Sequence, residues 1–216
     1  MPPKEYFEAI RRICTERGAI MIVDEAQTAF GRTGRWFAIE HFGVVPDMVT
    51  ISKSLGGSVP LSAVTVTKSI AEDLEAKGFS QISSHGGDPF LCAVGLANIE
   101  IIERRSLLAH AESIGSYLRA GLEDLMNRYE IVGDVRGIGL MLGIEIVKDK
   151  DTRRPAPDLA NLITSRSMER GLILFGGLGS NVIRITPPLV LTSSEVDQAL
   201  EIMEEAVRFA SEGGRL

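Results

Sequence analysis

Two short apolar runs that end beside ionisable residues constrain the fold of this chain most. Residues 19–23 are wholly apolar and lead directly into Asp24. Met48–Ile51 is mostly apolar and ends shortly before Lys53. Runs of this length and character are typical of strands buried on both faces of a parallel sheet. A third run at 62–67 completes three expected parallel strands, and the helical patterns between the runs predict an α/β fold.

The pattern changes near residue 104, so we expect two domains, 1–104 and 105–216. Three parallel strands make a thin sheet, and the first domain therefore resembles the later part of a larger α/β domain. The second domain has the pattern of a small α+β domain. Its expected helices cover residues 107–129, 159–170 and 193–210, and its expected strands cover 131–135, 140–147, 172–174 and 182–185.

Charge and composition exclude several classes of function. The chain carries 23 basic and 29 acidic side chains, a net charge of −6, which disfavours binding to nucleic acid. Two cysteines, Cys14 and Cys92, cannot build a disulfide framework and fit a reducing compartment. No apolar run reaches the roughly 18 residues that a membrane span needs. We therefore expect a cytoplasmic protein without a membrane or nucleic-acid partner.

Asp24 and Lys53 are the first candidates for chemistry, because ligands bind at the carboxyl ends of strands in open α/β sheets. The flanks of Lys53 are apolar and short of acids, so we expect its amine to be buried, with a lowered pKa. A pyridoxal phosphate (PLP) site needs an acid at the pyridine nitrogen and a lysine at the aldehyde. Gln27 lies where it could reach the phenolic oxygen of PLP. A loop cap at Asp24 and a loop hydrogen bond at Gln27 remain alternatives.

Residues 24–27, Asp-Glu-Ala-Gln, also resemble the metal-binding box of helicase-type ATPases. That interpretation requires a phosphate-binding loop of the form GxxxxGK[ST], which this sequence lacks.

Two further segments carry candidate ligand-binding residues. Residues 83–89 precede a predicted helix, and hydroxyl and N–H groups at a helix start suit a phosphate. The alternative is that Asp88 caps the helix and His85 is an ordinary loop residue. Arg184 lies between apolar neighbours in a predicted strand, where a guanidinium requires an anionic partner. That partner is either a substrate carboxylate or a buried Asp or Glu of the chain.

These segments together resemble the class III aminotransferases, which are PLP enzymes of fold type I. The resemblance is carried by the stretches DEAQTAFGRTGRWFAIEHFGVVPDMVTISKSLGGSVPLSAV, SSHGGDPFLCAVGLANIEII, GDVRGIGLMLGIEIVKDKDTRRPAP and NVIRITPPLVLTSSEVD. It implies the later part of the large PLP-binding domain, followed by the small C-terminal domain, in a homodimer that acts on an amino acid and a keto acid. The resemblance implies that Asp24 pairs with the pyridine nitrogen of PLP, that Gln27 contacts its ring hydroxyl and that Lys53 forms the Schiff base. It further implies that Ser84 contacts the phosphate of the partner subunit's cofactor and that Arg184 binds the substrate carboxylate.

Within the family the chain is similar to the 2,2-dialkylglycine decarboxylases, which have Asp where many relatives have Asn at position 88. The resemblance implies that an alkali cation, K⁺ or Na⁺, is held by Asp88 and by the carbonyls of Ser84 and Gly86. It also implies decarboxylation-dependent transamination of 2,2-dialkylglycines with pyruvate. An ordinary ω-amino or α-amino acid transaminase and a non-catalytic fragment are the alternatives. The family's phosphate loop and ring-stacking aromatic precede the region matched here, so we expect this chain alone to bind PLP weakly or not at all.

Overall fold

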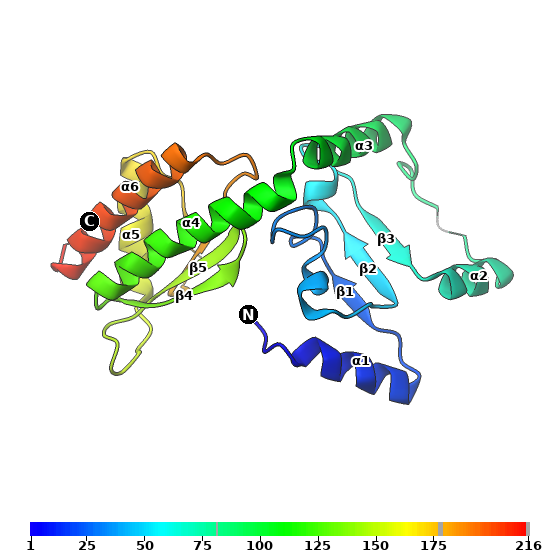
Figure 1. Ribbon diagram of the computed structural model, residues 1–216, viewed down its shortest axis with the longest axis horizontal. Helices are drawn as coiled ribbons and strands as arrows, with labels where there is room; N and C mark the ends of the chain where they lie inside the picture. Colours follow the sequence, from blue (N-terminus) through cyan, green and yellow to red (C-terminus); the bar gives the residue numbers. More distant parts are fainter. Residues whose placement is uncertain (81, 177–178, 215–216) are drawn as a thin grey trace. The chain divides into compact units, whose positions relative to one another are not determined.

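The structure is a computed structural model that describes residues 1–80, 82–176 and 179–214. It divides into two compact units, Met1–Leu108 and Ala109–Leu216, which are described separately below (Figure 1). The sequence predicted a boundary at residue 104, and the observed units divide between Leu108 and Ala109.

The first unit contains a mixed three-stranded sheet with β2 in the centre (Figure 1). Strands β1 (Ile22–Asp24) and β2 (Met48–Ile51) run parallel, whereas β3 (Ala63–Val66) runs antiparallel to β2. The α/β class is confirmed, but the expectation of three parallel strands is wrong for β3. A parallel return needs a long crossover, and the connection from β2 to β3 holds only the short 3₁₀ helix η2 (Lys53–Leu55).

Helices precede, separate and follow the strands of the first unit, as expected for an α/β fold. Helix α1 ends at Gly18, whose φ of 62° places it in the left-handed region that terminates many helices. Apart from η2, the helices of this unit are α1 (Tyr6–Arg17), η1 (Ala38–Phe42), α2 (Lys68–Ala76) and α3 (Pro89–Arg104).

The expectation that β1 is buried on both faces is wrong. Met21 is buried in a small cluster, and Val23 packs against the same cluster together with Phe7 and Ile10 of α1. Ile22 points to the opposite face, because side chains alternate along a strand, and it is 59% exposed. Within this unit, α1 therefore covers one face of β1 and leaves the other open.

The second unit is built on a four-stranded antiparallel sheet in the order β4-β5-β7-β6. The strand expected at 172–174 forms later, at β6, where the chain pairs with β7. The elements of this unit are α4 (Leu107–Arg128), β4 (Val132–Ile138), β5 (Met141–Ile146), α5 (Pro157–Glu169), β6 (Phe175–Gly176), β7 (Val182–Ile185) and α6 (Ser193–Ser211).

The main hydrophobic core lies in this second unit, between the sheet and its helices. A Cβ at Gly115 of α4 would lie 2.3 Å from the carbonyl oxygen of Gly139, so only glycine permits α4 to approach the β4–β5 turn. The core side chains that are almost fully buried include Leu122, Leu125, Ile144, Ile183, Val196 and Met203. Among the described residues, no helix combines the length and apolarity required to cross a lipid bilayer.

We expect Ile144→Ala to lower the free energy of unfolding of this unit by about 2–5 kcal/mol, because the cavity would be enclosed on all sides. Ile144 has no exposed surface, whereas Ile173 is 84% exposed. The matched variant Ile173→Ala should change stability by less than about 0.5 kcal/mol. Urea unfolding of both variants measures the difference, and equal losses would contradict the assigned core.

Candidate active site

Asp24 lies at the carboxyl end of β1, directly beside Thr50 of the parallel strand β2. Its Oδ1 accepts hydrogen bonds from the Ala26 N–H at 2.9 Å and the Thr50 hydroxyl at 3.0 Å. These two hydrogen bonds, with a smaller contribution from the positive charge of Lys53, hold the pKa of Asp24 below its usual value. The first unit therefore presents an ionised, exposed carboxylate at this edge of its sheet.

Lys53 is the first residue of η2, just beyond the end of β2. The expectation that it is buried is wrong, because its side chain is exposed in this chain. The apolar residues that flank Lys53 in the sequence suggested burial. Leu55 is indeed buried, but Lys53 is not. The Lys53 charge nevertheless acts on the carboxyl group of Asp24 and lowers its pKa. The structure thus places the predicted acid and the predicted lysine at the ends of two neighbouring parallel strands.

Glu25 is a structural contributor that the sequence analysis missed. It is 1% exposed, and its carboxylate accepts hydrogen bonds from Ile39 N–H at 2.8 Å, Ala38 N–H at 3.1 Å and the Thr28 hydroxyl. These donors hold the start of η1 against the turn that carries the half-buried Gln27. The sequence signal for a buried Glu25 is its position directly after Asp24. Side chains alternate along a strand, so two consecutive acids point to opposite faces.

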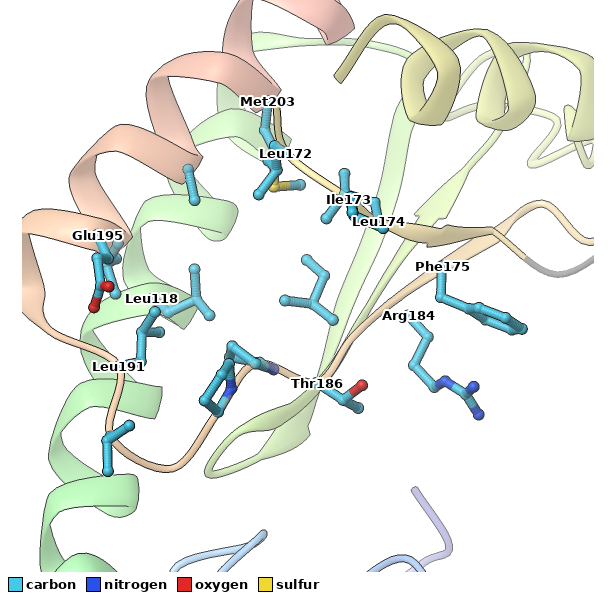
Figure 2. Close-up of a pocket in the computed structure, with 16 residues that line it drawn as sticks. Leu118, Leu172, Ile173, Leu174, Phe175, Arg184, Thr186, Leu191, Glu195 and Met203 are labelled. Atoms are coloured by element: carbon cyan, nitrogen blue, oxygen red, sulfur yellow. The ribbon is translucent and has the colours of Figure 1, made fainter. Parts of the chain in front are cut away.

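Arg184 is central in the sheet of the second unit, opposite Gly143 of β5 and Phe175 of β6. Its Cζ lies 4.6 Å from the centroid of the Phe175 ring, which is cation–π geometry. Figure 2 shows this pair at one side of a pocket. The buried Nε has no hydrogen-bond partner in the part of the chain that the structure describes, and no described carboxylate forms an ion pair with Arg184. Among the described residues Arg184 thus has no salt bridge to an Asp or Glu, and its role toward a substrate carboxylate stays a prediction.

The pocket beside Arg184 has a volume of about 470 Å³ and lies wholly within the second unit. That volume falls within the range of small-molecule sites. Its wall is mostly apolar, with contributions from Leu118, Leu172, Ile185, Val196 and Met203.

Asp88 caps helix α3, because its Oδ1 accepts a hydrogen bond from the Phe90 N–H at 3.0 Å. The helix-cap interpretation is confirmed. The other carboxylate oxygen lies 3.6 Å from Nδ1 of His85. The binding of an alkali cation by Asp88 and by the carbonyls of Ser84 and Gly86 stays a prediction.

Ser84 is exposed in the loop that precedes α3. Its implied role toward the cofactor of a partner subunit also stays a prediction. Over the described ranges, no three or more His, Cys, Asp or Glu side chains gather as a metal site.

Comparison with known proteins identifies the family. Residues 1–207 match the family model described as aminotransferase class-III. The chain belongs to the class III aminotransferase family. It is 44% identical over 215 residues to the leucine/methionine racemase of Thermococcus litoralis, covering 99% of this chain and 47% of that protein. It is 36% identical over 203 residues to the 5-aminovalerate aminotransferase of Pseudomonas aeruginosa, covering 94% of this chain and 47% of that protein.

Solved structures agree with this family. A transaminase from the marine bacterium Virgibacillus superposes with a TM-score of 0.93 at 34% identity, over 99% of this chain and 50% of that one. A Bacillus anthracis aminotransferase superposes with a TM-score of 0.91 at 35% identity, over 96% of this chain and 49% of that one. The predicted fold of a type I PLP enzyme is confirmed, and the chain spans about half the length of the relatives it matches.

Membership in the class III aminotransferases leaves the ATPase interpretation of residues 24–27 without support. Proteins of this family are PLP-dependent, and amino acids and keto acids are their expected substrates. The position of Asp24 and Lys53 at neighbouring strand ends agrees with the roles that the resemblance implies for them.

We expect Thr50→Val to raise the pKa of Asp24, because it removes the hydroxyl that favours the ionised form. Protonation of Asp24 should then begin at higher pH. A carboxyl ¹³C NMR titration measures the change. Thr65→Val is the matched control, because Thr65 is exposed on β3 and pairs with Val49. An unchanged Asp24 titration in Thr50→Val would contradict this account.

Proposed function

We propose that this chain carries the cofactor-binding acid and lysine of a PLP-dependent enzyme that transfers an amino group between an amino acid and a keto acid. The observation that supports it most is the ionised Asp24 next to Lys53, at the carboxyl ends of two neighbouring parallel strands. A carboxylate suits a protonated pyridine nitrogen, and a primary amine suits an aldehyde, so this donor set fits PLP.

When bound, PLP supplies an electron sink for bonds at the α-carbon of the substrate. Asp24 would hold the proton on the pyridine nitrogen, and Gln27 would hydrogen-bond to the ring hydroxyl. The Nζ of Lys53 would carry the cofactor and would later move a proton at the substrate α-carbon. Arg184 would bind the substrate carboxylate with its guanidinium fork. Its buried, unpartnered Nε supports that role.

The subunit arrangement and the compartment are parts of the same proposal. In a homodimer, Ser84 would offer its hydroxyl to the phosphate of the partner subunit's cofactor, and its exposure is compatible with that role. Cys14 and Cys92 are both free thiols, which supports the cytoplasm as the compartment.

Racemisation is a second candidate, because two of the relatives are named as amino acid racemases. Besides the leucine/methionine racemase, the alanine/serine racemase of Pyrococcus horikoshii is 41% identical over 209 residues, covering 96% of this chain and 43% of that protein. Racemisation also moves the α-proton but consumes no keto acid. Decarboxylation of 2,2-dialkylglycines is a narrower hypothesis, which rests on Asp88 and on the stretch GDVRGIGLMLGIEIVKDK.

Borohydride reduction in the presence of saturating PLP, followed by peptide mass mapping, should place a pyridoxyl group on Lys53 in preference to Lys68. Lys68 is the matched control, because its side chain is 89% exposed and lies outside the site. Asp24→Asn should reduce the preference, since it removes the charge that favours the pyridinium. Equal labelling of both lysines in the folded wild-type protein would refute the proposed cofactor site.

When the chain is complemented with the preceding half of a full-length relative, incubation with PLP, L-leucine and pyruvate should yield alanine in a reaction that requires both PLP and pyruvate. Chiral chromatography detects D-leucine, and its formation without pyruvate would assign racemisation instead. Release of CO₂ from 2-aminoisobutyrate in the presence of pyruvate would assign the decarboxylase reaction. Selective labelling of Lys53 without any of these products would indicate a non-catalytic fragment.

A further inference from the structure

The backbone of Lys53 has an unusual conformation. Its φ of 40° lies in the left-handed region, which residues other than glycine rarely occupy. Such a conformation costs free energy and persists only where surrounding contacts hold it, most often at functional sites. The contacts around η2 must therefore compensate for the strain at Lys53.

The hydrogen bonds within η2 are local and account for only part of this restraint. The Leu55 N–H donates to the Ser52 carbonyl at 2.9 Å, and the Gly56 N–H donates to the Lys53 carbonyl at 3.2 Å. The Ser54 carbonyl accepts a longer hydrogen bond, 3.4 Å, from the Gly57 N–H. Each of these bonds joins residues three positions apart, so the contact that ties the turn to the rest of the unit comes from elsewhere in the chain.

Asn98 of helix α3 supplies that contact. Its Nδ2 donates to the Ser54 carbonyl at 2.5 Å and approaches the Leu55 carbonyl at 3.5 Å. The half-buried amide thus bridges to the two residues that directly follow Lys53, across 44 positions of sequence. The bond depends on a donor, since both partners are carbonyl oxygens.

Helix α3 lies close enough for this bond because Gly95 leaves room beside the turn. A Cβ at Gly95 would come within 2.6 Å of Leu61 Cδ2 and 3.5 Å of the Leu55 carbonyl oxygen. Gly95 and Asn98 are three residues apart on a helix and therefore share a face. That face is where α3 packs against the turn.

We propose that Asn98 is a positioning residue for Lys53: its amide holds the carbonyls of Ser54 and Leu55 and thereby keeps the Lys53 backbone in its strained conformation. That conformation fixes where the Lys53 side chain leaves the backbone, and the charge of this side chain acts on Asp24. This inference rests on the proposed function only in assigning Lys53 as the PLP lysine.

The test compares Asn98→Ala and Asn98→Asp with Asn161→Asp in the 216-residue chain. Asn98→Ala removes the donor, and Asn98→Asp puts an acceptor against two carbonyls. Asn161 lies exposed in α5, so Asn161→Asp controls for an added charge in a helix. For each variant we would measure the ratio of pyridoxyl labelling at Lys53 to that at Lys68, together with amide hydrogen exchange at Leu55 and Gly56.

Both Asn98 variants should lower the labelling ratio by about fivefold, the effect of one lost hydrogen bond, and should speed exchange at Leu55 and Gly56. Asn161→Asp should change neither quantity. An unchanged ratio in folded Asn98→Ala would overturn the proposal, as would a lower melting temperature with an unchanged ratio. If Asn98→Asp fails to fold, Asn98→Ala decides.

Failure of the proposed function gives a different result. Wild-type protein would then show no preference for Lys53, while the hydrogen-exchange comparison would still report whether Asn98 holds the turn.

Discussion

The parallel pairing of β1 with β2 is the interaction on which the candidate active site depends. The pairing places Asp24 beside Thr50, whose hydroxyl helps to keep the carboxylate ionised. It also ends both strands at the same edge, so that Lys53 follows within reach of the charge on Asp24. Two residues that are separated by a long loop thus act on one another because two short strands share a register.

A second set of contacts holds the backbone around this edge. Glu25 is buried, and its carboxylate accepts hydrogen bonds from backbone and hydroxyl donors, which compensate the cost of burying it. Asn98 acts on the other strand end, where it donates to carbonyls of the turn after Lys53. In both places, a polar side chain outside the candidate site restrains a segment that carries one of its residues.

Sequence reasoning located the candidate acid and lysine at their strand ends but not their surroundings. The run before Asp24 and the run before Lys53 were recognisable because strand ends carry ligand-binding residues in this fold class. The predicted burial of Lys53 was wrong, since apolar neighbours in sequence need not be neighbours in space. The antiparallel direction of β3 and the donor from Asn98 depend on contacts between distant segments, which no local pattern encodes.

Arg184 in the second unit likewise separates what the sequence shows from what only the fold shows. Its apolar neighbours in the sequence indicated that the guanidinium needs an anion, but left open whether the chain itself supplies one. The folded sheet places Phe175 against it and no described carboxylate within ion-pair distance, so the partner that the structure describes is an aromatic ring. The sequence by itself determined the class of fold, the family and the identity of the ionisable groups, because these follow from local pattern and residue type. Only the tertiary structure decided which groups are exposed, paired or held under strain, because burial and pairing depend on what packs against each side chain.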